Sequence, residues 1–121
     1  MKIIPRQVHA LLDYSWSAAI AVAPKVMGFD DDKTASRFLR AMGTATAAGS
    51  LLTRYELGAI KVMPFKMHLA TDALGAALGL ASPWLFGFAQ NKAARNTALA
   101  FFALEAVVVI LSQTDEMDEN A

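Results

Sequence analysis

The sequence contains no cysteine, only two histidines and few charged residues, which make up 18% of the chain. The absence of cysteine excludes disulfides, thiolate sites for zinc or iron–sulfur clusters, c-type haem attachment and a cysteine nucleophile. Lysine plus arginine and aspartate plus glutamate number 11 each, so the formal net charge is zero. Without an overall positive field, nucleic acid is not an expected partner.

Hydrophobic residues are abundant by contrast. They make up 55% of the chain, against about 45–50% in ordinary soluble domains. This balance excludes intrinsic disorder and leans towards membrane proteins. A length of 121 residues favours a single domain spanning residues 1–121.

An internal duplication organises this domain. The sequence matches itself at an offset of 59 residues without a gap, and the matched residues are mainly of the types that fix turns or carry chemistry. The matched pairs are Pro5 with Pro64, His9 with His68, Asp13 with Asp72, Pro24 with Pro83, Gly28 with Gly87, Phe29 with Phe88, and Lys33 with Lys92. We therefore predict two repeats, at about residues 1–59 and 60–121.

Each repeat contains two apolar stretches of helical length. They run from about Val8 to Ala23, Ala35 to Thr53, Met67 to Phe88 and Ala94 to Ser112. They are rich in Ala, Leu and Met and lack the alternation of strands, so they predict helices. The predicted fold is all-α, a four-helix bundle made of two tandem helical hairpins.

The third and fourth helices lack the polar stripe that a water-soluble bundle needs on its outer face. The run from Ala73 to Asn91 carries no charge, and Glu105 is the one charged residue between Ala98 and Leu111. All four stretches approach the length of about 20 residues that crosses a bilayer. The pattern favours four transmembrane helices with the lipid bilayer as partner, and a soluble, oligomeric four-helix bundle is the alternative.

Residues 82–88, Ser-Pro-Trp-Leu-Phe-Gly-Phe, follow His68 and Asp72 in the second repeat. This run resembles the SPW-repeat family of small bacterial integral membrane proteins. The first repeat departs from that pattern, with Ala-Pro-Lys at residues 23–25. The resemblance implies a multi-pass protein of the bacterial inner (cytoplasmic) membrane, and it implies no activity and no catalytic residue.

Two histidines and three carboxylates are the candidate functional residues. His9 and Asp13, like His68 and Asp72, are four residues apart and share a helix face. Two hairpins in the same orientation are related by an axis along the membrane normal, which would bring both pairs together. Glu105 is predicted at a comparable depth. Such a cluster could hold a divalent metal or relay protons, or each histidine could simply pair with its own aspartate.

Two further groups have predicted structural roles. Gly75 and Gly79 form a Gly-x-x-x-Gly motif, which favours close helix packing within the bundle or between copies in a homo-oligomer. Trp84, Phe86 and Phe88 are predicted to follow the third helix and anchor it at the lipid headgroups.

The sequence thus favours a non-enzymatic membrane component, such as a proton or small-solute conduit or a subunit that supports a partner. A metal-dependent membrane enzyme using the His/Asp/Glu cluster is the alternative. No cofactor is predicted apart from a divalent metal in that cluster.

Overall fold

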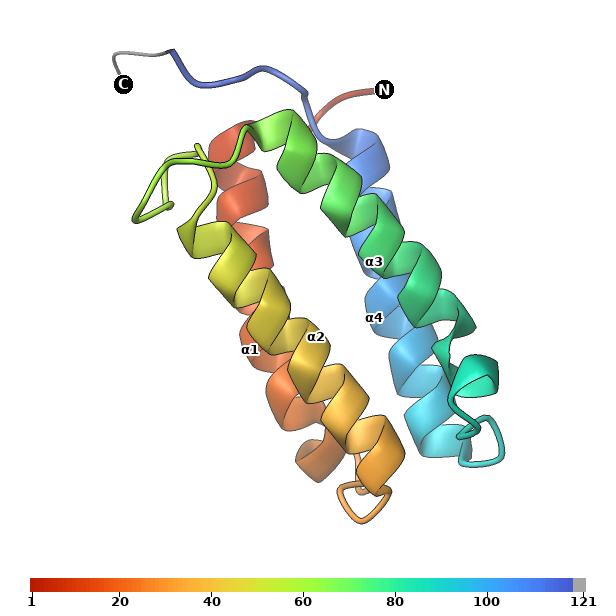
Figure 1. Cartoon of the computed structure of the whole chain (residues 1–121). Helices are drawn as coiled ribbons and strands as arrows, with labels where there is room; N and C mark the ends of the chain where they lie inside the picture. The colour runs from red at the N-terminus through yellow and green to blue at the C-terminus, as the bar shows by residue number, and fades with distance from the viewer. Residues whose placement is uncertain (119–121) are drawn as a thin grey trace.

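Four α-helices make up most of the computed structural model, which describes residues 1–118 (Figure 1). They are α1 (Arg6–Val26), α2 (Lys33–Leu51), α3 (Phe65–Leu85) and α4 (Lys92–Leu111). The predictions of an all-helical fold and of two helical hairpins are confirmed for this part of the chain. Residues 119–121, the end of the predicted second repeat, lie outside the described residues.

Every helix begins two residues earlier than its apolar pattern suggests. α1 and α3 start directly after Pro5 and Pro64, without a side-chain cap, whereas a capping side chain precedes α2 and α4. The side chains of Asp32 and Asn91 accept hydrogen bonds from the main-chain N–H of Ala35 and Ala94. Asp and Asn are preferred at this position because their oxygens satisfy otherwise unpaired N–H groups. Asn91 Nδ2 also donates to Asp32 Oδ2 at 3.1 Å, which joins the two caps.

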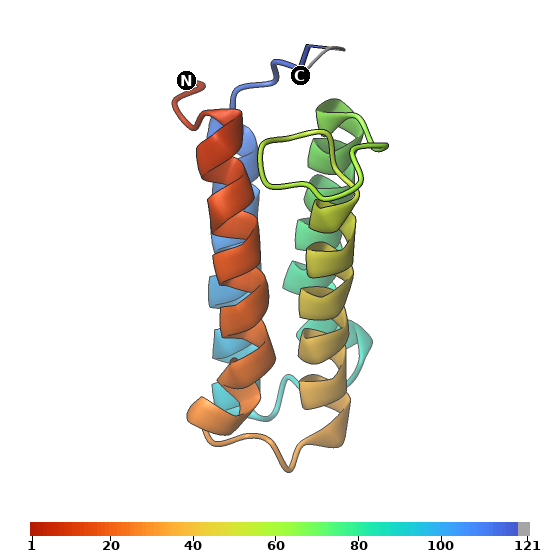
Figure 2. The same cartoon turned by 90° about the vertical axis from the view of Figure 1, so that its left-hand side faces the viewer.

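The helices pack mainly within each hairpin, α1 against α2 and α3 against α4 (Figure 1). The two hairpins lie side by side, with α1 next to α4 and α2 next to α3 (Figure 2). The N-terminus, the segment that follows α4 and the loop of residues 52–64 lie at one end of the bundle, which we call the terminal end (Figure 1). The loops that join α1 to α2 and α3 to α4 lie at the opposite, far end. The two hairpins therefore run in the same orientation.

Repeated residues end α1 and α3 in the same way. Gly28 and Gly87 have φ angles of +79° and +77°, which glycine adopts without the steric penalty of a side chain. The next N–H, of Phe29, donates to the carbonyl of Pro24 at 2.8 Å, and the second repeat repeats this bond at 2.8 Å. This is a Schellman motif, and it turns the following phenylalanine into the core.

The prediction that Phe88 anchors the protein at lipid headgroups is wrong. Its side chain is only 3% exposed, because the turn after Gly87 directs it inward with Phe29. Trp84 and Phe86 are exposed, but Trp84 belongs to the last turn of α3 rather than to the segment after it. Only these two aromatic residues have the exposure that an anchor requires.

In the core at the far end, the large and the small residue of a helix–helix contact change places between the repeats. In the first repeat Ile20 of α1 packs on Gly43 of α2. In the second, the glycine is Gly79 of α3 and the large residue is Phe102 of α4. Positions 20 and 79 correspond at the offset of 59, as do positions 43 and 102. Each hairpin thus keeps one small and one large residue at the same level.

Main-chain pairing closes the terminal end. Ile4 pairs with Ser112, and the corresponding residues of the other repeat, Met63 and Thr53, pair in the same way. Gln113 N donates to the carbonyl of Ile4 at 2.8 Å. Each helix that ends at this end is therefore tied to the segment that precedes a neighbouring helix, α2 to α3 and α4 to α1.

The outer surface of the bundle is apolar along its middle. Within the four helices, the charged residues away from the helix ends are Asp13, Arg40, Asp72 and Glu105. The three carboxyl side chains are buried, whereas Arg40 is partly exposed and forms an ion pair with Asp30 of the far-end loop. Large apolar side chains are exposed between the ends, and Leu74 is 72% exposed. Other exposed members of this apolar belt are Leu11, Val22, Leu78, Leu104, Val107 and Ile110. Among the residues that the structure describes, α4 is the one helix long and apolar enough to be a candidate membrane span.

The contact between Gly79 and Phe102 yields a test of the packing. A Cβ at position 79 would lie 2.0 Å from the ring of Phe102, so we expect Gly79→Ala to destabilise the bundle by about 1–3 kcal/mol. Nothing lies within 4 Å of a Cβ at Gly49 in α2, so Gly49→Ala should stabilise by about 0.5–1 kcal/mol. Thermal unfolding in mild detergent measures both. Equal effects of the two substitutions would contradict this packing.

Candidate functional site: a buried His/Asp quartet

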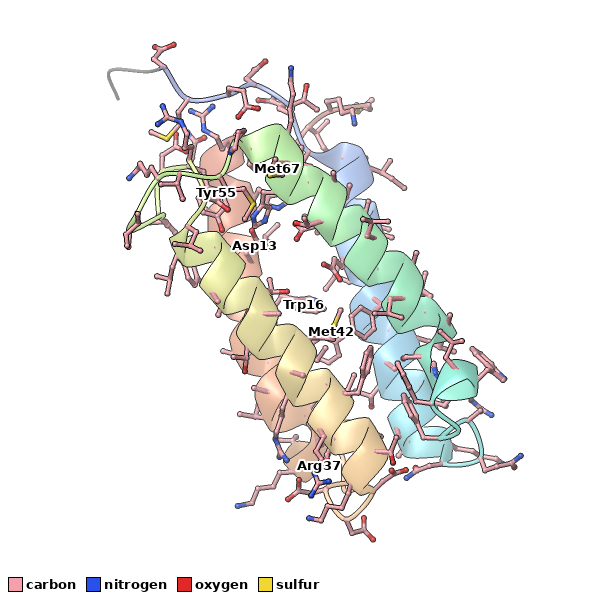
Figure 3. All side chains as sticks on the ribbon, in the orientation of Figure 1. Asp13, Trp16, Arg37, Met42, Tyr55 and Met67 are labelled. Carbon is pink, nitrogen blue, oxygen red and sulfur yellow. The ribbon has the colours of Figure 1, made fainter. Side chains whose placement is uncertain are left out.

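The candidate site lies between the first turns of α1 and α3, near the terminal end. His9 and Asp13 come from α1, and His68 and Asp72 come from α3. All four residues are buried, and one ligand atom from each lies within 4.8 Å of the others. We call these residues the His/Asp quartet. In Figure 3 Asp13 lies in the interior between Tyr55 and Trp16.

Each histidine contacts both aspartates rather than only the one on its own helix. His9 Nε2 lies 3.1 Å from Asp72 Oδ2 and 3.3 Å from Asp13 Oδ1. His68 Nε2 lies 2.8 Å from Asp13 Oδ2 and 3.0 Å from Asp72 Oδ2. The interpretation in which each histidine pairs only with its own aspartate is therefore wrong, because the bundle brings the two helix faces against each other.

The other nitrogen of each histidine binds a hydroxyl from the opposite repeat. His9 Nδ1 lies 2.7 Å from Ser112 Oγ, and His68 Nδ1 lies 2.7 Å from Thr53 Oγ1. Thr53 and Ser112 correspond at the offset of 59. Main-chain pairing at the terminal end holds both in place.

These hydroxyls determine which nitrogen carries a proton. Thr53 Oγ1 donates its hydrogen to the carbonyl of Gly49 at 2.7 Å, and Ser112 Oγ donates to that of Val108 at 2.6 Å. A hydroxyl has one hydrogen to donate, so each must accept from its histidine. Nδ1 is therefore protonated in both rings, and Nε2 faces the aspartates.

His68 Nε2 has no hydrogen bond despite its two close carboxylate oxygens. Among residues 1–118, this buried atom has no partner of acceptable geometry. The distances of 2.8 and 3.0 Å to the two oxygens are short enough for hydrogen bonds. Direction must therefore prevent them, and both oxygens lie off the line along which an N–H would point.

Aromatic residues enclose the quartet. The Phe65 ring meets the His9 ring edge-on, with centroids 5.2 Å apart. Tyr55, from the loop of residues 52–64, donates its hydroxyl to Asp13 Oδ2 at 3.0 Å. Burial raises the pKa of Tyr55, and the nearby charge of Asp13 raises it further, so the hydroxyl keeps its proton as a donor.

Two further contacts at the terminal end hold the loop of residues 52–64 and the segment after α4 against the helices that carry the quartet. Arg6 forms a two-pronged ion pair with Glu56, with Nε 2.9 Å from Oε1, and this bond lowers the pKa of Glu56. Glu116 accepts from the N–H groups of Phe65 and Lys66 at the start of α3. A carboxylate there is stabilised by the helix dipole.

Glu105, the fifth predicted residue, lies beside the quartet. It lines a cleft of about 230 Å³ together with Asp13 and Asp72. Its side chain is buried, and its Oε2 has no hydrogen-bond partner within residues 1–118. It therefore shares a cavity with the two aspartates.

The two predicted packing glycines face the interior. A Cβ on Gly75 would lie 3.5 Å from Met42 and 3.7 Å from Glu105 Oε1, whereas Gly79 packs on Phe102. Sequence reasoning did not include Thr53, Ser112 or Tyr55 in the site. The alignment of Thr53 with Ser112 in the duplication was a usable signal, but Tyr55 aligns with Thr114 and gave none.

The quartet has the donor set and spacing of a transition-metal site. Tetrahedral zinc with ligands at about 2.0–2.1 Å separates neighbouring ligand atoms by about 3.3–3.4 Å. The four Nε2–oxygen distances, between 2.8 and 3.3 Å, involve both oxygens of Asp13 and Oδ2 of Asp72, and they are up to about half an ångström shorter than that spacing. Hydrogen-bonding of Nδ1 to a fixed acceptor is the usual support of a histidine that binds metal through Nε2.

Comparison of the chain with protein-family models, with curated proteins and with solved structures found no match. The functional argument therefore depends on the geometry of the site.

The hydroxyl contacts predict a selective loss of stability. Thr53→Val keeps the shape of the side chain but leaves the buried Nδ1–H of His68 without an acceptor, so unfolding should become easier by about 1–3 kcal/mol. Thr53→Ser should restore most of this. Thr44→Val, at an exposed position of α2, is the matched control and should change little. Stability in detergent and the ¹⁵N shifts of His68 are measured; an unprotonated Nδ1 would contradict the assignment.

Proposed function

We propose that this protein is a small integral membrane protein that holds one divalent transition-metal ion, zinc in the first instance, at the His/Asp quartet. His9 and His68 supply Nε2, and Asp13 and Asp72 supply one oxygen each. The protein acts as a non-enzymatic membrane component in this proposal.

One observation carries the metal proposal: four ligand atoms of the right type converge within 4.8 Å in the buried interior. Both histidines are held with Nδ1 protonated, so Nε2 is the nitrogen that would bind a metal. In His9 the metal would replace the hydrogen bond between Nε2 and Asp72 Oδ2. Two neutral imidazoles, two carboxylates and a divalent ion sum to zero charge. Neutrality matters because an unbalanced charge in a low-dielectric interior is costly.

The apolar belt supports the membrane part of the proposal. Helices of 19 to 21 residues are about 28–32 Å long at 1.5 Å per residue, which is close to the hydrocarbon thickness of about 30 Å. Charged side chains gather at the two ends of the bundle, as Arg37 does at the far end (Figure 3). The resemblance of residues 82–88 to the SPW-repeat proteins supports the proposal that this bundle lies in a bacterial inner membrane.

Metal analysis of the purified chain tests the site. We expect one equivalent of Zn²⁺ or Co²⁺ per chain, and the Co²⁺ form should show the intense visible bands of a four-coordinate centre. The protein must carry no polyhistidine tag, because the chain has only two histidines and both belong to the quartet.

Substitution separates the metal site from adventitious binding. His9→Ala and His68→Ala should each lose the bound ion, whereas Asp31→Asn, at an exposed position of the far-end loop, should keep it. If either histidine variant fails to fold, Asp72→Asn provides a second test. It keeps the shape of the ligand and should weaken metal binding. A folded chain with no stoichiometric metal would show instead that the quartet is an ion-paired set of two imidazolium and two carboxylate groups.

The membrane assignment has its own test. The chain has no native cysteine, so Leu74→Cys and Asp31→Cys can each carry one spin label. In lipid bilayers the label at position 74 should be accessible to oxygen and shielded from a water-soluble nickel chelate, and the label at position 31 should behave in the opposite way. Free access of the chelate to position 74, in a chain that is monodisperse without detergent, would favour the soluble bundle.

A further inference from the structure

The cleft beside the quartet lies between α1 and α4, in the middle of the bundle. Trp16 and Ala19 of α1 face Phe101 and Leu104 of α4 across it, and Glu105 lies among them. The exposed residues among its lining include Leu12 and Ala19 of α1 and Leu104 of α4, which lie within the helices, so the cleft opens on the side of the bundle rather than at an end. Its walls are mainly apolar.

Three carboxyl groups line this cleft, and no lysine, arginine or histidine does. Asp13 and Asp72 already face the two histidines of the quartet. Glu105 differs from them, because its side chain is 92% buried and its Oε2 has no partner within the part of the chain that the structure describes. A buried polar atom without a partner is costly unless something binds it.

Aromatic rings stand next to this carboxyl group. The Trp16 and Phe101 rings are arranged edge to face with centroids 6.1 Å apart. Trp16 Nε1 donates to the main-chain carbonyl of Phe101 at 2.9 Å, so its one hydrogen-bond donor is already used. The indole N–H is thus not available to a ligand, and the indole contributes its π surface, which attracts cations.

We propose that the cleft between α1 and α4 binds a small lipophilic organic cation, whose charged nitrogen lies against Glu105 and whose apolar body contacts Trp16, Phe101 and Leu104. The apolar walls, the aromatic faces and the single uncompensated carboxyl group together select this class of ligand. A neutral apolar molecule would leave Glu105 without a partner, and an anion would be repelled by the Glu105 carboxylate.

The ligand site adjoins the quartet, since Asp13 and Asp72 line the cleft, but its charged group, Glu105, is not a member of the quartet. Asp13 and Asp72 are balanced by the quartet, whether by a metal ion or by protonated histidines, and Glu105 lies outside it. The proposal of a cation site therefore does not depend on the proposal of a metal site, and it can be tested on metal-free protein.

Fluorescence of Trp16 provides the test. The chain has two tryptophans, so Trp84→Phe leaves Trp16, on the cleft wall, as the only one. In a neutral maltoside detergent, benzyltrimethylammonium should change the Trp16 emission in a saturable way. Neopentylbenzene has the same shape without the charge and should neither saturate this signal nor compete for the site.

Two variants locate the binding. Glu105→Gln keeps the size of the side chain and removes the charge, and should weaken benzyltrimethylammonium binding by about tenfold or more. Asp31→Asn removes a distant carboxylate and should leave the affinity unchanged. Ala19→Leu fills the opposite wall while keeping Glu105, and should also weaken binding, which keeps the proposal testable if Glu105→Gln does not fold.

Equal affinity of the parent and of a folded Glu105→Gln variant would overturn the proposal. So would equally effective competition by neopentylbenzene, which would show the cleft to be an apolar cavity without charge selectivity. Absence of any saturable change in Trp16 emission would exclude the cation from the cleft. None of these results depends on whether the quartet contains metal.

Discussion

Two imidazoles and two carboxylates meet in an interior that otherwise contains mostly apolar groups, and the need to balance their charge constrains the rest of the bundle. Each histidine needs both aspartates, so α1 and α3 must present their polar faces to each other at one level. Each Nδ1 needs an acceptor, so α2 and α4 must end where Thr53 and Ser112 reach the rings. The main-chain pairing of the terminal end meets this second requirement.

The repeats agree where the quartet requires it and differ where the cleft is formed. Trp16 corresponds to Gly75, and Glu105 corresponds to Thr46. The large indole and the carboxyl group therefore occur on the α1/α4 side only. The asymmetry of two positions explains why one side of a nearly symmetric bundle carries a carboxyl-lined cleft.

Much of the fold follows from local pattern. Helix number and hairpin pairing follow from apolar stretches separated by turn residues, and the turn after α1 follows from Pro24 and Gly28. The buried position of Phe88 does not follow from local pattern. An aromatic residue after a helix has the same local signal whether it turns towards lipid or into the core. Only the complete turn, with its left-handed glycine, determines the direction.

The candidate site was predictable only where its residues lie close together in the sequence. The spacing of His9 and Asp13, and its recurrence at His68 and Asp72, places each pair on one helix face. That each histidine contacts the aspartate of the other helix depends on the distance and rotation between α1 and α3, which no short-range pattern encodes. Tyr55 reaches Asp13 from a loop, and loop paths depend on long-range pairing of the kind between Thr53 and Met63.

The tie between Ile4 and Ser112 has a consequence for the origin of the fold. One hairpin alone has a histidine on its first helix and a hydroxyl after its second, and here each hydroxyl binds the histidine of the opposite hairpin. Two identical half-length chains, associated about a twofold axis, would complete each other in the same way. The duplicated polypeptide thus has the arrangement of a homodimer whose two subunits are joined in one chain, and joining them allows the two halves to carry different residues at equivalent positions.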